Sequence, residues 1–327
     1  MNKRRILLFA EHSAWGAASN FNEMFTQSGK YESIEIVAHT GGKNGYSFGK
    51  EKDIQKELYA RNERIKSLVE RKDTIFLIFD VNGLQLFLRC MNELGENITN
   101  RPINIFWSGN PYILNHTACN EWVSENGITP FAMLDLLSYD NNSIPLMQPY
   151  NTESLKKYRV GYKNKGNNNF TICHSPGHKG RGNEKGTNII RNTIDSLALN
   201  SKLKINYNQL GDEIWLTHDE CLKEKSKCDI FIDKLGEASA GGIGKSGIEG
   251  ICMGIPTISA MHKSTLSGRY ENLSQVACDS VEGLASEITN LMTDAEYYQE
   301  KQEQMKKLAI LFSYQETLSY IEERMSK

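Results

Sequence analysis

Residues 233–249 read Asp233-Lys-Leu-Gly-Glu-Ala-Ser-Ala-Gly-Gly-Ile-Gly-Lys-Ser-Gly-Ile-Glu249. A short apolar run over 229–233 predicts a buried strand before this stretch, and helical spacing begins near Lys245. Amides at a helix N-terminus carry partial positive charge, and glycines let a phosphate approach the backbone closely. The stretch therefore predicts a strand, a phosphate-binding loop and a helix; the alternative is an ordinary surface loop before a helix cap.

Two glycine motifs overlap in this loop. Residues 242–247 match GxGxxG, but they lie late in the chain and outside a first βαβ unit, where that motif is informative. Gly244-Lys245-Ser246 resembles the end of a P-loop, yet Ser239 stands where GxxxxGK[ST] requires its first glycine. The sequence therefore disfavours a P-loop NTPase.

Short apolar runs alternate with amphipathic stretches on both sides of the loop. Strands are expected over 6–10, 34–38, 74–79, 103–107, 170–174, 203–208, 229–233 and 256–260. Helices are expected over 54–69, 84–94, 187–199, 218–225, 245–253, 280–292 and from 313 to 324. This βαβ alternation is typical of parallel sheets covered on both faces, so we expect an α/β protein of two doubly wound Rossmann-like domains.

The domain boundary is expected where the alternation stops. Residues 161–169 have loop composition, and 327 residues suit two domains. We predict an N-terminal domain over 1–155 and a C-terminal domain over 156–312. The terminal helix, 313–327, is expected to cross back to the N-terminal domain.

Composition excludes several classes of protein. The 38 Lys+Arg and 40 Asp+Glu give a formal charge of −2, which excludes a generally basic nucleic-acid coat. The mean hydropathy of −0.49 and the lack of a long apolar run exclude a membrane span. Seven cysteines without CxxC spacing predict neither a disulfide framework nor a zinc site. We expect most of them to be small buried thiols and the protein to be cytoplasmic.

A basic segment follows the domain boundary. Residues 154–187 hold eight Lys or Arg and one acidic residue, Glu184. Lys179, Arg181 and Lys185 lie between an expected strand and an expected helix. A charge run is usually a solvated face, but at such a turn these cations would neutralise a diphosphate.

The C-terminal half resembles a known family. His174-Ser-Pro, Lys185-Gly-Thr187, the glycine-rich loop and Glu249-Gly-Ile-Cys-Met-Gly-Ile-Pro-Thr-Ile258 are similar to the nucleotide-binding domain of GT-B glycosyltransferases of the retaining family 4 type. The resemblance implies two domains facing each other across a cleft, with the acceptor side in residues 1–155 and nucleotide-sugar binding in residues 156–312. It also implies an enzyme that moves a sugar from a nucleoside-diphosphate sugar to a hydroxyl acceptor with retention. No DxD motif follows a strand, so we infer no metal and no further cofactor.

The resemblance assigns roles to residues on the donor side. Lys185 would contact the diphosphate, with Lys179 or Arg181 in place of the family's arginine, and Glu249 the ribose. The first glutamate of the family's E-x7-E motif is replaced by Gly241, and Glu237 is its nearest substitute. The complete set of expected donor-binding residues is Gly16, Glu237, Gly242, Gly244, Lys245, Ser246, Gly247 and Glu249.

On the acceptor side, Trp15 and Tyr112 are expected in loops, where they could stack on a sugar or base. Asp80 and His116 are candidates for a general base, and each could equally be structural. The acceptor could be a glycan, a lipid, a small molecule or a hydroxymethylated base of phage-type DNA. Because Gly241 replaces the first glutamate, a non-catalytic nucleotide-sugar-binding protein is an alternative from a different class.

Overall fold

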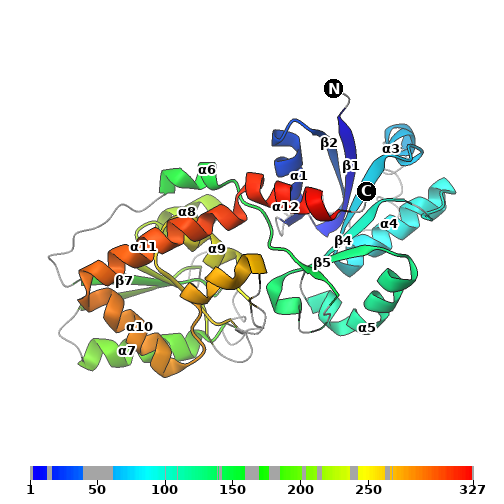
Figure 1. Cartoon of the computed structure of the whole chain (residues 1–327). Helices are drawn as coiled ribbons and strands as arrows, with labels where there is room; N and C mark the ends of the chain where they lie inside the picture. The colour runs from blue at the N-terminus through cyan, green and yellow to red at the C-terminus, as the bar shows by residue number, and fades with distance from the viewer. Residues whose placement is uncertain are drawn as a thin grey trace. The chain divides into compact units, whose positions relative to one another are not determined.

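The structure is a computed structural model. It describes residues 3–12, 17–39, 62–99, 101–108, 110–137, 139, 142–158, 169–176, 185–200, 204–211, 216–235, 242–261, 266 and 268–325. The chain divides into two compact units, which we describe separately (Figure 1). Unit 1 comprises Met1–Tyr150 with Tyr314–Lys327, and unit 2 comprises Asn151–Ser313. The predicted boundary at residue 155 falls inside unit 2.

Unit 1 is built on a parallel sheet with the strand order β2-β1-β3-β4-β5-β6. Its strands are β1 (Arg4–His12), β2 (Tyr31–His39), β3 (Thr74–Phe79), β4 (Ile103–Trp107), β5 (Thr129–Ala132) and β6 (Ile144–Pro145). Its helices are α1 (Ala17–Gln27), α3 (Asn62–Val69), α4 (Asp80–Leu94), α5 (Asn110–Glu125) and α12 (Tyr314–Arg324).

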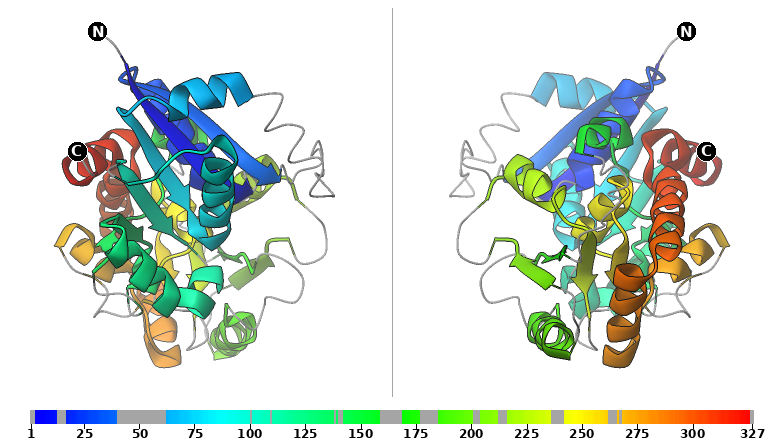
Figure 2. Two further views of the ribbon diagram at one scale, coloured as in Figure 1. Left: turned by 90° about the vertical axis from the view of Figure 1, so that its right-hand side faces the viewer. Right: turned by 90° about the vertical axis from the view of Figure 1, so that its left-hand side faces the viewer.

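Helices cover both faces of this sheet. On one face, Phe21 of α1 and Ile321 of α12 join a core with alternate residues of β1 and β3. On the other face, Val69 of α3, Phe87 of α4 and Val123 of α5 pack on the remaining strand residues. The terminal helix α12 thus belongs to the core of unit 1, as the dark red helix in Figure 2 illustrates.

Unit 2 is built on a second parallel sheet, with the order β10-β9-β7-β8. Its strands are β7 (Asn169–His174), β8 (Lys204–Gln209), β9 (Ile230–Lys234) and β10 (Thr257–Ser259). Its helices are α6 (Thr152–Leu155), α7 (Thr187–Asn200), α8 (His218–Lys225), α9 (Lys245–Cys252), α10 (Val281–Thr293) and α11 (Ala295–Ala309). Figure 1 shows α7 and α10 on one side of the strands and α8, α9 and α11 on the other.

The alternation along β9 explains these two layers. Ile230 and Ile232 are buried against α7 and α10. Phe231 and Asp233 lie on the opposite face, close to the glycines of α9. A strand buried on both faces reads as a continuous apolar run, and Asp233 is the polar residue that ends it.

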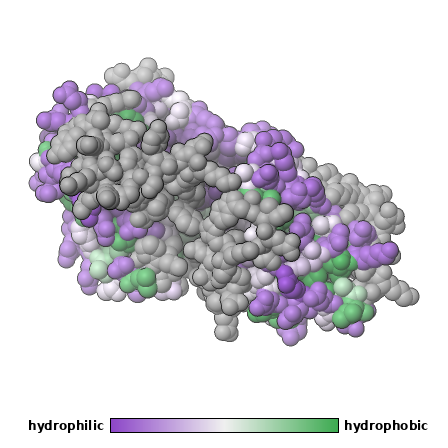
Figure 3. Space-filling view, turned by 180° about the vertical axis from the view of Figure 1, so that it is seen from behind, coloured by the Kyte–Doolittle hydropathy of each residue, from purple (hydrophilic) through white to green (hydrophobic). Residues whose placement is uncertain are grey.

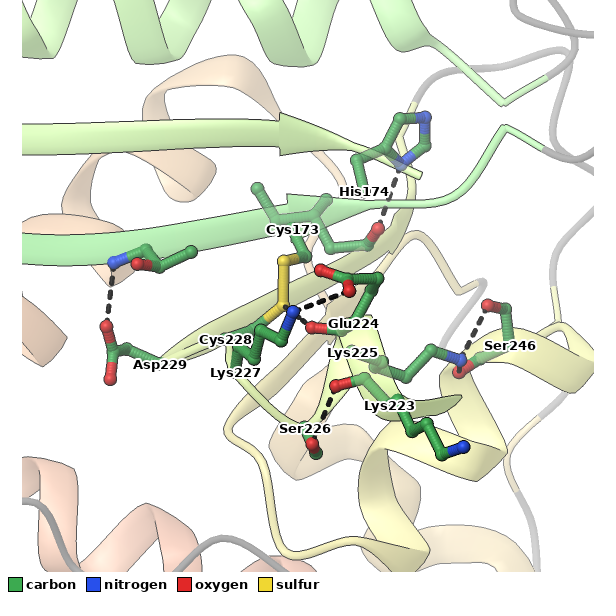
Figure 4. The surroundings of a disulfide bond; sticks show 12 residues. Cys173, His174, Lys223, Glu224, Lys225, Ser226, Lys227, Cys228, Asp229 and Ser246 are labelled. Carbon is green, nitrogen blue, oxygen red and sulfur yellow. Dashed lines mark hydrogen bonds and ion pairs between the residues drawn. A yellow bond between two sulfur atoms is a disulfide. The ribbon is translucent and has the colours of Figure 1, made fainter. Parts of the chain in front are cut away.

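Of the helix predicted over 54–69, the structure describes Asn62–Val69, and the rest of that prediction lies outside the described residues. Two other expectations from the sequence need correction. Tyr112, expected in a loop, lies within α5. The cysteines are not all free thiols, because Cys173 of β7 and Cys228 before β9 form a disulfide with a Cα–Cα distance of 5.8 Å (Figure 4). Cys90, Cys119, Cys221, Cys252 and Cys278 are free.

The described surface is mostly hydrophilic on the face drawn in Figure 3, with hydrophobic residues in small separate groups. The most exposed large apolar side chains are Leu199 and Leu114, which lie in different units. Within the described ranges, every helix is too short or too polar to cross a bilayer.

Candidate functional site

The strand order of unit 2 locates its binding edge. From β7 the chain proceeds through α7 to β8 on one side, and β9 pairs with β7 on the other. Ligands of open α/β sheets bind outside the carboxyl ends of the strands at such a switch point. The carboxyl ends of β7 and β9 carry His174 and Asp233, and Lys185 lies in the turn that opens α7.

The Lys185 side chain is held by protein partners and is partly exposed to solvent. Its Nζ donates to the Ser175 carbonyl at 2.9 Å and lies 3.6 Å from Asp233 Oδ1, and its side chain is 25% exposed. The next residue, Gly186, has φ 70°, and a Cβ there would lie 1.7 Å from the Leu235 carbonyl oxygen. The Leu235 N–H donates to the Lys185 carbonyl at 3.0 Å. Both backbone and side chain of Lys185 are therefore fixed.

Asp233 is the buried anion of this site. Its Oδ2 accepts hydrogen bonds from the Gly244 N–H at 2.7 Å and from Ser259 Oγ at 3.2 Å. Complete burial alone would raise the pKa of Asp233, but Lys185, Lys234 and the Gly244 amide together hold that pKa below its usual value. The carboxylate is thus ionised, and it accepts a hydrogen bond from the Gly244 amide, which we expected to bind a phosphate.

His174 has a structural position beside Lys185. Its Nδ1 lies 2.9 Å from the Ile232 carbonyl and its Nε2 lies 2.9 Å from Thr187 Oγ1. Burial, assisted by the Lys185 charge, lowers the pKa of His174 to about 4 although the Ile232 bond opposes it. The neutral ring therefore donates from Nδ1 and accepts at Nε2, and it links β7 and β9 to α7.

A second buried ion pair lies behind the first turn of α9. Lys225 of α8 is fully buried, and its Nζ donates to Glu249 Oε2 at 2.8 Å. It also donates to Ser246 Oγ at 2.8 Å and to the Ser246 carbonyl at 2.9 Å (Figure 4). Glu249 Oε1 lies 2.7 Å from His218 Nε2. Burial would raise the pKa of Glu249, but Lys225 and His218 lower it to about 2. Ser246 and Glu249 are therefore occupied by the protein itself.

The glycines of the GxGxxG match serve packing as well as the loop. A Cβ on Gly247 would lie 2.7 Å from Ile243 Cγ1 and 3.0 Å from Asp233 Cβ, so glycine lets α9 approach β9. Gly242 is buried beside them, whereas Lys245 is exposed at the first position of α9. Of the donor-side candidates in this helix, Lys245 thus presents its side chain to solvent.

The candidates of unit 1 have different surroundings. Asp80 follows β3 next to β1, the switch point of that sheet, and its φ of 62° is the left-handed conformation that non-glycine residues rarely adopt. His116 on α5 contacts the Tyr139 ring at 5.3 Å. Tyr112 is fully buried and stacks on Trp107 at 4.8 Å, so its ring does not reach a sugar at the surface.

Five predicted site residues lie outside the described residues: Trp15, Gly16, Lys179, Arg181 and Glu237. Their roles stay predictions. Among the described residues, no group of three His, Cys, Asp or Glu side chains could hold a metal ion.

Sequence reasoning missed three polar residues that the fold brings to the site. Asp233 ends a predicted strand, and its polar side chain in an apolar run was the available signal. Lys225 and His218 carried none, because an isolated lysine or histidine on a helix is usually solvated. Both become recognisable only when α8 packs beside α9.

No protein-family model matches this chain, and no curated protein matches it. The solved structures that are similar to it include two transferases and an epimerase. One is an alpha-glucosyltransferase in complex with UDP-glucose and DNA containing an abasic site, with TM-score 0.61 and 13% identity over 98% of this chain and 100% of that chain. Another is a trehalose-6-phosphate synthase studied for glycosyl transfer with retention, with TM-score 0.60 and 11% identity over 98% of each chain.

The third is a UDP-N-acetylglucosamine 2-epimerase, with TM-score 0.51 and 10% identity over 98% of this chain and 96% of that chain. Because the three similar proteins include both transferases and an epimerase, the likeness does not choose between their activities. It does establish the architecture that the sequence resemblance implied. The chain has the GT-B fold, with two Rossmann-like α/β domains.

Proposed function

We propose that this chain is a hexosyl- or pentosyltransferase that moves a sugar from a nucleoside diphosphate to a hydroxyl acceptor with retention, using no metal and no cofactor. The observation that carries the proposal is the fixed ammonium of Lys185 at the switch point of unit 2. The fold and the transferases that share it support this function.

The chemistry explains why such an ammonium is useful. When the glycosidic bond breaks, negative charge grows on the leaving diphosphate. A cation that is already in place stabilises this charge without reorganising in the transition state. Ser175 and Asp233 hold Lys185 Nζ, and the sequence adds Lys179 and Arg181 as further cations before the same helix.

Release of nucleoside diphosphate from UDP-, GDP- and ADP-sugars, measured in EDTA, tests the proposal. Lys185→Ala should lower kcat by about 10²- to 10³-fold, the usual effect of removing one preorganised stabilising group. Lys223→Ala is the matched control, since Lys223 is an exposed α8 lysine paired with Asp219 at 2.6 Å. No release from any donor would contradict a transferase, and a Lys185→Ala effect on affinity alone would indicate a non-catalytic binding protein.

For the acceptor, DNA carrying a hydroxymethylated base is a second, more specific candidate. It is favoured by the similar alpha-glucosyltransferase, whose complex contains DNA, and by the basic segment at 154–187. A duplex with 5-hydroxymethylcytosine should then accept labelled sugar while the same duplex with cytosine does not, and binding should weaken steeply with salt. Equal, negligible labelling of both duplexes would leave a glycan, lipid or small molecule as acceptor.

A further inference from the structure

Lys225, Glu249 and His218 form an ionic cluster behind α9, and His218 is its exposed member. It is the first residue of α8, and because α8 leads back to β9, its N-terminus lies at the carboxyl edge of the sheet, the same edge as Lys185. The His218 side chain is 60% exposed, whereas Glu249 is 5% exposed and Lys225 is fully buried. A ligand at this edge therefore meets His218 before it meets Glu249.

The partners of His218 decide what its ring can bind. Glu249 is ionised and accepts hydrogen bonds only, so Nε2 carries the proton in their 2.7 Å contact. The other ring nitrogen, Nδ1, has no hydrogen-bond partner among the described residues. A hydroxyl group suits this nitrogen, because a hydroxyl can both donate and accept a hydrogen bond.

Cys221 connects this histidine to the diphosphate side. It lies on α8 one turn after His218, on the same helix face. Burial raises the pKa of the Cys221 thiol, and the charges of Lys225, Glu249 and Lys185 all act on it. The charges of the Glu249 cluster and of Lys185 thus both reach this one thiol.

We propose that His218, oriented by Glu249, binds a ribose hydroxyl of a nucleoside diphosphate whose phosphates lie at Lys185. The inference rests on the proposed function and alters one part of what the resemblance implies. In the family that the sequence resembles, Glu249 would contact the ribose directly. In this structure Lys225 and His218 each bind one of its oxygens. Glu249 is therefore a positioning residue, and His218 makes the contact.

Calorimetric binding of UDP, GDP and ADP, each with its 2′-deoxy and 3′-deoxy form, tests the contact. For the nucleotide that binds, His218→Ala should weaken the ribose form about 5- to 10-fold, the value of one hydrogen bond, and leave at least one deoxy form unchanged. His218→Phe should behave like His218→Ala, since it keeps a ring but loses both ring nitrogens. Lys223→Ala is the control on the same helix and should change none of these affinities.

Two results would overturn the inference while leaving the proposed function intact. One is an unchanged preference for ribose in His218→Ala; the other is an equal loss for ribose and both deoxy forms, which would indicate a structural role. Failure of the wild type to bind any of the nucleotides would overturn the proposed function itself, and the inference with it.

Discussion

Replacing Lys225 by methionine tests the electrostatic account of the site most directly. The ammonium is fully buried, donates three hydrogen bonds to Ser246 and Glu249, and lies 4.5 Å from the centre of the Phe231 ring. Methionine fills a similar volume but removes the charge, so Glu249 keeps a buried carboxylate whose remaining partner is the exposed His218. Breaking a buried pair in this way costs about 3–5 kcal/mol.

A second substitution separates this cost from lost packing. In Lys225→Met/Glu249→Leu both charges are gone, and replacing a whole buried pair by apolar residues is often neutral or stabilising. The double variant should therefore be more stable than Lys225→Met alone, although the Ser246 oxygens still lose their donor. Lys223→Ala, which breaks an exposed pair, should change stability by under about 1 kcal/mol.

The assay has to report on unit 2, because two units can unfold separately. Native-state hydrogen exchange of the α8 and α9 amides in urea measures the free energy of opening for this part of the fold. A Lys225→Met cost below about 1 kcal/mol, or a double variant less stable than the single one, would refute the account: the pair would then contribute no net charge compensation.

Three further predictions concern stability. In thermal unfolding, Gly186→Ala should lower stability more than Gly29→Ala. Both glycines have φ 70° and share the left-handed penalty of about 1–2 kcal/mol, but only at Gly186 would the Cβ collide with backbone. Reducing Cys173–Cys228, which closes a 55-residue separation, should lower the urea midpoint by the equivalent of up to about 4 kcal/mol, and unchanged midpoints would contradict this. The folded pKa of Glu249, about 2, lies below its unfolded value near 4.5, so its stabilisation is complete above pH 4.5 and should be lost as pH falls towards 2, as seen by hydrogen exchange.

Strands β3, β4 and β9 could be predicted from the sequence because they are buried on both faces, whereas the short strands β5 and β6 were missed. Strands β3 and β4 have the bounds expected from their apolar runs, and α8 has the bounds expected from its spacing. Helix α5 was not predicted, and its first residues, Asn110-Pro111, are typical of a turn. Proline is tolerated in the first turn of a helix, so the same residues also suit a helix start, and burial of Tyr112 against Trp107 decides for the helix.

The position of Lys185 at a strand-to-helix turn could be predicted, but its ion-pair partner could not. Asp233 lies 48 residues further along the chain and meets Lys185 only because β7 and β9 are neighbours in the sheet. Lys225 and Glu249 likewise meet through the packing of α8 and α9. No local pattern encodes such pairs, since each side chain taken alone suits a solvated position.

The glycine-rich loop also changes meaning once Asp233 is in place. A phosphate at the N-terminus of α9 would compete with this buried carboxylate for the Gly244 amide, and two anions would then share one helix end. Lys185 resolves the conflict, because its Nζ lies beside Asp233 on one side and is open to solvent on another. The diphosphate is therefore expected at Lys185 rather than at the Gly244 amide, while Gly247 is required for α9 to pack on β9. Anion binding in this protein then depends on a side chain held by an internal carboxylate, which is why removing Lys185 should affect kcat more than any substitution in the loop.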